Sequence, residues 1–373
     1  MLDVDGQPIA KFPFVRSEGT AFDVGRSHGA AFGEQVAHCI ALYQQAFETS
    51  GAPPWPDILE IAASAGQRIR DHDPSLADEL DGIAAGADVD SREIYAVNIR
   101  SGVLRRADVA QQMAPAECTT AACLPEATAD GHTLLAQNWD KFSSCGAHTV
   151  VIEQHTVGEP ALLFVTEAGI LYRNGMTDAG IGIVGNALSS DRERSSDAGF
   201  PGAVARRRAL RQRDLSSAMS EIVDSPRDMS GNHMLASAHE GAAIDLEAVP
   251  DEVFTVAPEG GVLAHSNHFL NADACAVLQD RLPPKHPSTL YRDCRVRDAL
   301  SDKRGTITVS DVQEALRDHH KFPEAVCTHP KDPEDPRAVA TVSSNVMDLT
   351  AGQMWVAPGA PCEHDYTLYE FSY

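Results

Sequence analysis

The sequence is poor in positive charge, with 30 Lys and Arg residues against 54 Asp and Glu residues and a formal net charge of -24. A chain this acidic repels phosphate backbones and anionic lipid surfaces, which argues against nucleic acid or a membrane as its partner. Long apolar runs are also absent, and none approaches the roughly 18 residues that a spanning helix needs. The N-terminus, MLDVDGQPIAKFPF, lacks the basic start and the apolar stretch of a signal peptide. We therefore expect a cytoplasmic protein.

Paired cysteines are lacking as well. The eight cysteines among the 373 residues include no CxxC pair and follow no regular spacing. In a chain without a signal peptide, this pattern indicates reduced and mostly buried thiols rather than a disulfide framework. Neither His265 with His268 nor His319 with His320 and His329 has the spacing of a complete zinc site. We therefore expect no metal and no cofactor, although one of the thiols can still serve as a nucleophile.

What the sequence does have is the composition of a globular protein, with 43% hydrophobic and 23% charged residues. Its length allows one large domain or two smaller ones. Residues 20–112 are predicted to be mostly helical, because apolar residues recur at helical spacing from Phe32 to Phe47. Further helices are predicted over 55–71, 73–86 and 91–104, with prolines between them.

The predicted secondary structure changes from helices to strands near residue 115, where short β-like runs separated by turns begin. A single basic helix is predicted over 202–223, and further helices over 289–301 and 310–320. Strands are predicted over 119–124, 133–139, 149–156, 161–172, 180–188, 233–238, 242–247, 253–257, 262–265, 338–349 and 353–357. Helices first and antiparallel-looking strands later indicate an α+β fold or a layered αββα arrangement.

The most informative stretch lies where the predicted helices give way to strands, and it reads PAECTTAAC from Pro115 to Cys123. A cysteine that opens a strand is usually a packing residue, so Cys118 alone indicates little. A second element, QNWD at 137–140, follows after a turn, and a third, HSNH at 265–268, comes much later. It is the order of the three elements that is informative.

In this order the three elements resemble the isopenicillin-N acyltransferase-like family of N-terminal-nucleophile enzymes. The family's Cys-Thr-Thr-Ala-x-Cys start stands here as Cys118–Cys123, and its Gln-Asn-Trp-Asp motif as 137–140. The resemblance spans about residues 25 to 362 and implies a four-layer αββα sandwich, with two antiparallel sheets between helical layers. Other family-like segments are 25–29, 98–100, 175–186, 346–349 and 355–359.

The resemblance implies a precursor that cuts itself between Glu117 and Cys118. Cys118 would then be both a new N-terminus and the nucleophile. Its free α-amino group, with an ordinary pKa of about 7.7–8.0, would be a well-matched general base for its own thiol. Residues 1–117 would form a helical segment and residues 118–373 the chain that carries the nucleophile. Both are expected to remain associated in one structural domain.

The resemblance also implies roles for further residues. Asp140 would hold the new ammonium group or the surroundings of the thiol. Asn267 would donate its side-chain N–H to the oxyanion of the tetrahedral intermediate. Asn138 and Asn186 are candidate substrate contacts. Cys123 is expected to be structural, because it lies an odd number of residues from the nucleophile and hence on the opposite side of the strand.

A dense basic run occupies residues 206–213, with five arginines. On a helix, Arg207 and Arg211 share a face, and we interpret the run as a solvated helix face that balances the acidic chain. The alternative is an anion contact to a substrate carboxylate or to the phosphates of coenzyme A, with Arg206 as the candidate residue.

The sequence therefore predicts an enzyme of amide-bond chemistry, in which an acyl group passes to Cys118 as a thioester. Transfer to water is the first expectation and would make the protein an amidohydrolase of a small N-acyl or amide substrate. The alternative is acyl transfer from a coenzyme A thioester or an amide to an amine. Glu117 stands where the family pattern has glycine, which leaves a third interpretation open, an uncleaved binding protein without catalysis.

Overall fold

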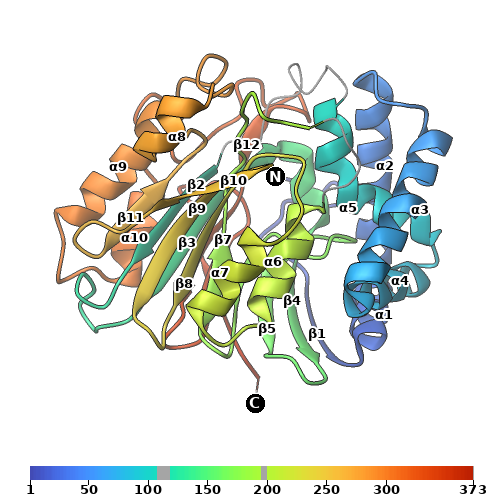
Figure 1. Cartoon of the computed structure of the whole chain (residues 1–373), viewed down its shortest axis with the longest axis horizontal. Helices are drawn as coiled ribbons and strands as arrows, with labels where there is room; N and C mark the ends of the chain where they lie inside the picture. The colour runs from blue at the N-terminus through green and yellow to red at the C-terminus, as the bar shows by residue number, and fades with distance from the viewer. Residues whose placement is uncertain (107–117, 195–199, 373) are drawn as a thin grey trace.

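The computed structural model describes residues 1–106, 118–194 and 200–372 (Figure 1). The predicted self-cleavage partner Glu117 lies outside the described residues, whereas Cys118 is the first residue of β2. Before the gap at 107–117 the elements are β1 (Phe14–Gly19), α1 (Ala21–Ala31), α2 (Gly33–Thr49), α3 (Trp55–His72), α4 (Pro74–Ala87) and α5 (Ser91–Arg106). The predicted helical first third is thus confirmed, with one strand added at its start.

One sheet has eight strands in the order β1-β4-β5-β6-β7-β8-β9-β10. All neighbours in it are antiparallel except β1, which pairs in parallel with β4. Its strands after β1 are β4 (Thr149–Thr156), β5 (Leu162–Glu167), β6 (Asn174–Thr177), β7 (Ile181–Val184), β8 (Gly231–Ser237), β9 (Ala242–Val249) and β10 (Glu252–Val256).

The second sheet has six strands in the order β11-β2-β3-β12-β13-β14, all antiparallel. The two strands that carry most of the recognised motifs, β2 and β3, are neighbours, and both are inner strands of this sheet. Its strands are β2 (Cys118–Cys123), β3 (Leu134–Phe142), β11 (Val262–His265), β12 (Val339–Asp348), β13 (Gln353–Ala357) and β14 (Thr367–Glu370).

The two sheets pack face to face, and helices cover both outer faces. An apolar core between the sheets joins Leu135 and Met347 of one sheet to Leu163 and Met234 of the other. A second core joins the eight-stranded sheet to α2–α5, α6 (Gly202–Leu210) and α7 (Leu215–Val223). A third joins the six-stranded sheet to α9 (Thr289–Ser301) and α10 (Val309–Ala315). Figure 1 shows the first helices and α9 with α10 on opposite sides, which is the predicted four-layer αββα sandwich of an α+β fold.

Several predicted boundaries differ from the structure. The single helix expected over 202–223 is two helices, because the Asp214 carboxylate accepts a hydrogen bond of 2.8 Å from Ser217 N and caps α7 as a separate element. The helix expected over 310–320 ends at Ala315, and turns follow it. The strands β1, β6 and β14 and the helix α8 (Ala272–Val277) were not predicted, and their four to six residues are too few for a periodic pattern to stand out.

The family-like segment at 25–29 serves helix packing. A methyl group added at Gly25 or Gly29 of α1 would collide with the backbone of α4, and one added at Gly82 or Gly86 of α4 would collide with the backbone of α1. The two helices therefore approach more closely than side chains would permit. In the part of the chain that the structure describes, no helix has both the length and the apolar character needed to cross a membrane.

Candidate active site

Cys118 opens β2, an inner strand of the six-stranded sheet, and its side chain is fully buried. Its register partner on β3 is Trp139, and because paired residues share a face, both side chains lie between the sheets. There the Cys118 Sγ accepts a hydrogen bond of 3.1 Å from Nη2 of Arg173. Arg173 directly precedes β6 of the opposite sheet, and its guanidinium lies 5.3 Å from the centre of the Trp139 ring. One sheet thus supplies the thiol and the other supplies a cation to it.

The surroundings of this thiol have opposing effects on its pKa. Burial raises the pKa of Cys118 above its usual value, and the positive charge of Arg173 opposes that rise. The charge of Asp140 raises the pKa further, while a hydrogen bond to the Asp140 backbone and the charge of Arg292 lower it. Because Arg173 is the strongest opposing influence, it is the group best placed to stabilise the thiolate, the reactive form of cysteine.

The backbone nitrogen of Cys118 is held by Asn267, which follows β11. This nitrogen donates to Asn267 Oδ1 at 2.7 Å, and the same oxygen accepts from Nη2 of the buried Arg292 at 2.8 Å. Nη1 of Arg292 also donates to the Cys118 carbonyl at 2.7 Å. Since Oδ1 receives two donors, the amide nitrogen of Asn267 points away from them and donates to Ala187 O at 2.9 Å. The structure therefore brings Asn267 to Cys118 through its oxygen, and a donation to an oxyanion would come from Nδ2.

Asp140 follows Trp139 on β3 and therefore faces the helical layer of α9 and α10. Its carboxylate is completely buried and accepts hydrogen bonds from Thr328 Oγ1 at 3.0 Å and from Thr341 Oγ1 at 2.7 Å. Its backbone lies beside Cys118, because Asp140 directly follows Trp139, the register partner of Cys118. The structure therefore places the Asp140 backbone beside Cys118 and its carboxylate on the opposite face of the sheet, where two hydroxyls hold it.

The two candidate substrate asparagines lie on different faces of the sheet. Asn138 shares the face of Asp140, and its Nδ2 donates to two backbone carbonyls of the segment 316–326, each at 2.8 Å. It therefore fastens that segment to β3, and the structure does not bring it to Cys118. Asn186 lies between the sheets and donates from Nδ2 at 3.0 Å to Thr120 Oγ1, two residues from Cys118 on the same face.

The structure contradicts a solvated face for the basic run. Arg207 of α6 is 2% exposed and donates to both carboxylate oxygens of Glu79 of α4, at 2.6 and 2.7 Å. Arg207 is drawn inward because α6 and α4 cover the same eight-stranded sheet and the two side chains meet there. Arg208 and Arg211, at the edge of this layer, pair with Glu221 at 2.8 Å and with Asp73 at 2.7 Å.

Arg206 is also buried, and its guanidinium contacts the backbone of Arg173. Among the described residues it donates to neutral acceptors, which are His233 Nδ1 at 3.1 Å, Asn232 O at 3.1 Å and Arg173 O at 3.3 Å. Burial, followed by the charge of Arg173, lowers the pKa of Arg206 to about 10. The anion contact considered for Arg206 would therefore act next to Arg173 rather than at the surface.

Sequence reasoning missed both arginines that touch Cys118. Arg173 stands two residues before the family-like segment 175–186, and that position was the one available signal. Arg292 belongs to the predicted helix 289–301, whose pattern does not distinguish it from its neighbours. The fold also gathers four Cys and His residues that their spacing did not group, namely His319, Cys327, His329 and Cys362.

Solved structures with a similar arrangement share little sequence with this chain. A mutant of the conjugated bile acid hydrolase from Clostridium perfringens is 13% identical, with a TM-score of 0.43, over 68% of this chain and 97% of that chain. A Caenorhabditis elegans ortholog of the N-acylethanolamine-hydrolyzing acid amidase is 14% identical, with a TM-score of 0.42, over 68% of this chain and 100% of that chain. Scores of this size describe a partial overlap of architecture and say nothing of activity.

The sequence itself is more specific. The chain is 28% identical to the acyl-coenzyme A:6-aminopenicillanic-acid-acyltransferase 40 kDa form of Emericella nidulans, over 95% of this chain and 94% of that protein. A model of the acyl-coenzyme A:6-aminopenicillanic acid acyl-transferase family matches residues 127–363, which is more than half of the chain and includes Asp140 and Asn267. With Cys118, Asp140 and Asn267 brought together by the fold, the chain belongs to the acyl-coenzyme A:6-aminopenicillanic acid acyl-transferase family of enzymes.

Proposed function

We propose that this protein is an autoprocessed amidohydrolase whose nucleophile is the thiol of Cys118. The observation that supports it is the setting of this one residue, with its nitrogen on Asn267 Oδ1 and its sulfur on Arg173. Freed by cleavage, the same nitrogen would be a base whose pKa suits neutral pH, within reach of its own thiol. Nucleophile, base, positioning amide and stabilising cation would then form one site.

Maturation follows from the same groups. The Cys118 sulfur attacks the Glu117 carbonyl carbon, a C–S bond forms, the C–N bond breaks, and the nitrogen takes the thiol proton. Water then attacks the thioester and releases Glu117 as a carboxylic acid and Cys118 as a free thiol with a free α-amino group. Arg173 and Arg292 bear on the electrostatics of this step, because both of their charges lower the pKa of Cys118.

Turnover repeats this chemistry on a small amide. The α-amino group takes the thiol proton, the sulfur attacks the substrate carbonyl, and the amine leaves with the proton that the α-amino group returns. Asn267 Nδ2 donates to the oxyanion, and Oδ1 keeps the base in place. Water, deprotonated by the α-amino group, then hydrolyses the thioester to a carboxylic acid.

A second function is favoured by one observation. The relative from Emericella nidulans is named an acyltransferase of acyl-coenzyme A and 6-aminopenicillanic acid, which supports an amine in place of water as the acceptor. We place hydrolysis first because water is always present, whereas transfer needs a second organised site. Amine release from N-acyl amides, measured with and without coenzyme A, separates the two: a hydrolase needs no coenzyme A, whereas a transferase makes amide or acyl-coenzyme A product only with the second substrate.

Purified protein is expected to consist of two pieces, residues 1–117 and 118–373. The cut falls there because the thiol can reach only the carbonyl that precedes its own nitrogen. Denaturing mass spectrometry measures both masses directly. A single uncut mass that persists through long incubation would overturn the proposal and leave the non-catalytic binding protein as the better interpretation.

Asn267→Ala is expected to lower kcat by about 10²–10³-fold with little change in KM, because an oxyanion donor acts in the transition state and not on bound substrate. Asn267→Asp is the sharper partner variant, since it keeps an oxygen for the Cys118 nitrogen but removes the donor. Steady-state kinetics of both are compared with Asn271→Ala, whose side chain caps α8. If Asn267→Asp retained full turnover, Asn267 would be a positioning residue and its assignment to the oxyanion would be wrong.

A further inference from the structure

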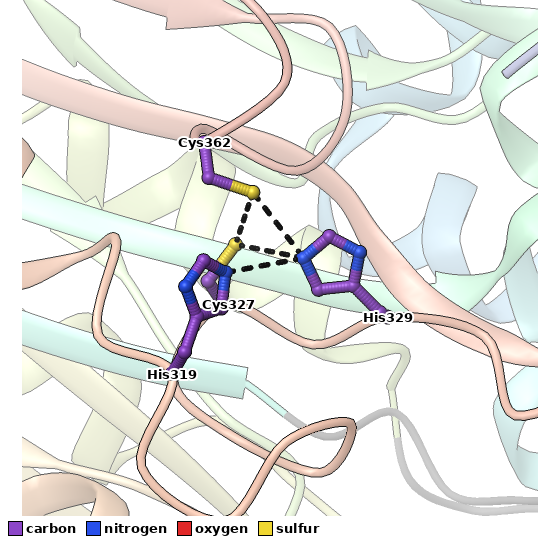
Figure 2. Close-up of side chains that lie close together, drawn as sticks. All are labelled: His319, Cys327, His329 and Cys362. Carbon is purple, nitrogen blue, oxygen red and sulfur yellow. Dashed lines mark hydrogen bonds between the residues drawn. The ribbon is translucent and has the colours of Figure 1, made fainter.

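We propose that His319, Cys327, His329 and Cys362 form a structural zinc site, separate from the nucleophile. Their four ligand atoms, two Nε2 and two Sγ, all lie within 4.8 Å of one another. Figure 2 shows the four side chains converging from different segments, with both sulfurs and the two imidazoles facing a common centre. Two thiolates and two imidazoles are one of the ligand sets that zinc takes in structural sites.

Four of the six distances between these atoms are close to those of a tetrahedron around zinc, and the other two, from His319 Nε2 to each sulfur, are within 4.8 Å. Bonds of about 2.3 Å to sulfur and about 2.0–2.1 Å to nitrogen imply edges of about 3.8 Å between sulfurs, about 3.6 Å between sulfur and nitrogen and about 3.3 Å between nitrogens. The two sulfurs are 3.5 Å apart, and the two Nε2 atoms are 3.2 Å apart. His329 Nε2 lies 3.6 Å from Cys327 Sγ and 3.2 Å from Cys362 Sγ. A metal would need these four distances to change by only a few tenths of an ångström.

Groups around the ligands support the same assignment. Glu363 Oε1 lies 3.4 Å from Nδ1 of His329, the ring nitrogen that points away from the cluster. A carboxylate in that place holds the proton on Nδ1 and leaves the Nε2 lone pair for a metal, as in many carboxylate–histidine–zinc arrangements. The Phe322 ring packs against His319 and His329, with ring centres 6.0 and 5.0 Å away, and limits their rotation.

The full set of four distinguishes a metal site from simpler explanations. A disulfide would use Cys327 and Cys362 alone and would not explain why two imidazoles present Nε2 to them. Two other groups of metal-binding side chains in the described part of the chain have three members each, and each includes a carboxylate that already bonds within its group, Glu167 or Asp348. With four protein ligands the proposed site is closed, which indicates a structural rather than a catalytic metal.

The site would fasten a segment that reaches the catalytic strand. Thr328, between two of the ligands, donates its hydroxyl to Asp140 Oδ2 at 3.0 Å, and its carbonyl accepts from Thr341 N at 3.0 Å. Cys362 comes from the loop after β13, so zinc would join this loop to the segment that precedes β12. Binding replaces two S–H protons, which pass to solvent, and thereby fixes the support of Asp140 without touching the substrate.

The test is the metal content of the full-length protein, which does not depend on activity. Protein is purified, treated with chelator, reconstituted with zinc under a thiol-free reductant and desalted. Native mass spectrometry and elemental analysis are expected to find about one zinc per chain. Cobalt in place of zinc is expected to give the visible bands and sulfur charge-transfer absorption of a tetrahedral thiolate site. Cys118→Ala should bind the same amount, which excludes the nucleophile as a ligand.

Variants locate the site. Cys327→Ser with Cys362→Ser, or His319→Ala with His329→Ala, is expected to lower the bound zinc at least tenfold. Glu363→Gln is expected to weaken zinc binding by about tenfold or more, as outer partners of ligands commonly do. Cys275→Ser and His320→Ala are the matched controls, because both residues are exposed and lie outside the cluster, and they should retain full occupancy.

Two results would overturn the zinc site. One is a reconstituted wild-type protein with no more zinc than the double-cysteine variant. The other is a Cys327–Cys362 disulfide that persists in reduced samples and excludes metal. Circular dichroism of the variants shows whether they fold, and the cobalt spectrum of the wild type needs no variant at all. Absence of autoprocessing would leave this inference untouched, because no ligand lies at the Glu117–Cys118 bond.

Discussion

Cys118→Ala is expected to remain a single chain of 373 residues and to lack all amidase and acyltransferase activity. The substitution removes the one sulfur that is proposed both to attack the Glu117 carbonyl and to carry the acyl group in turnover. The fold should persist, because the substitution removes only one buried sulfur atom and the Cys118 nitrogen can still donate to Asn267. Denaturing mass spectrometry measures the first loss, and release of amine from N-acyl amides measures the second.

The matched control is Cys123→Ala at the other end of the same strand. Cys123 is equally buried but belongs to the core beneath α9 and α10, on the face away from the nucleophile. It should be cut and active. A Cys118→Ala chain that still separates into two pieces, or that still turns over substrate, would show that another group is the nucleophile.

Glu79→Leu is expected to lower the free energy of unfolding by about 3–5 kcal/mol, because it leaves the charge of the buried Arg207 guanidinium without its carboxylate partner. Both side chains are 2% exposed, and two short hydrogen bonds join them. Burial alone would lower the pKa of Arg207, but the carboxylate of Glu79 raises it above its usual value. Without that carboxylate, burial would lower the pKa of Arg207, but the ordinary pKa of a guanidinium is so high that the charge stays on Arg207 when its partner is removed. Urea unfolding in the Cys118→Ala background, where the chain is uncut, measures the loss.

The double variant Glu79→Leu with Arg207→Met shows whether the lost stability comes from an uncompensated buried charge or from lost packing. Since it removes both charges, it should recover most of the lost stability. Glu252→Gln is the control, because its pair with Arg192 is exposed and should contribute nothing measurable. If the double variant were as unstable as Glu79→Leu, the cost would lie in packing rather than in the ion pair.

The parts of the fold that could be predicted from the sequence depend on local patterns. Periodicity located the first helices and most strands, and the break near residue 115 marked the passage from helices to sheets. The motifs at 118–123, 137–140 and 265–268 lie on β2, on β3 and just after β11, which are neighbours in one sheet. Adjacent strands bring the ordered motifs together, which is why the sequence could group Cys118, Asp140 and Asn267 as candidates for one site.

What could not be predicted depends on contacts between distant segments. Arg173 reaches Cys118 only because the two sheets stack, and Arg207 is buried only because α6 meets α4. The cluster of His319, Cys327, His329 and Cys362 was not predicted for the same reason. The predicted helix over 310–320 would have kept His319 on α10. The helix ends at Ala315, and the turns after it carry His319 to Cys327 and His329. Spacing along the chain says little when a loop determines the ligand geometry.

The division of the helical layer has a consequence for the mature enzyme. Every element from β1 to α5 precedes the proposed cut, so Glu79 and Arg207 would belong to different polypeptides that are held by β1 against β4 and by the α4–α6 contact. A precursor can refold in a first-order step, but two separated pieces must first find each other, which makes recovery second order and dependent on concentration. After self-cleavage the protein would thus no longer refold readily, and its lifetime would depend on how slowly it unfolds. The enzyme would assemble only once, as the uncut precursor.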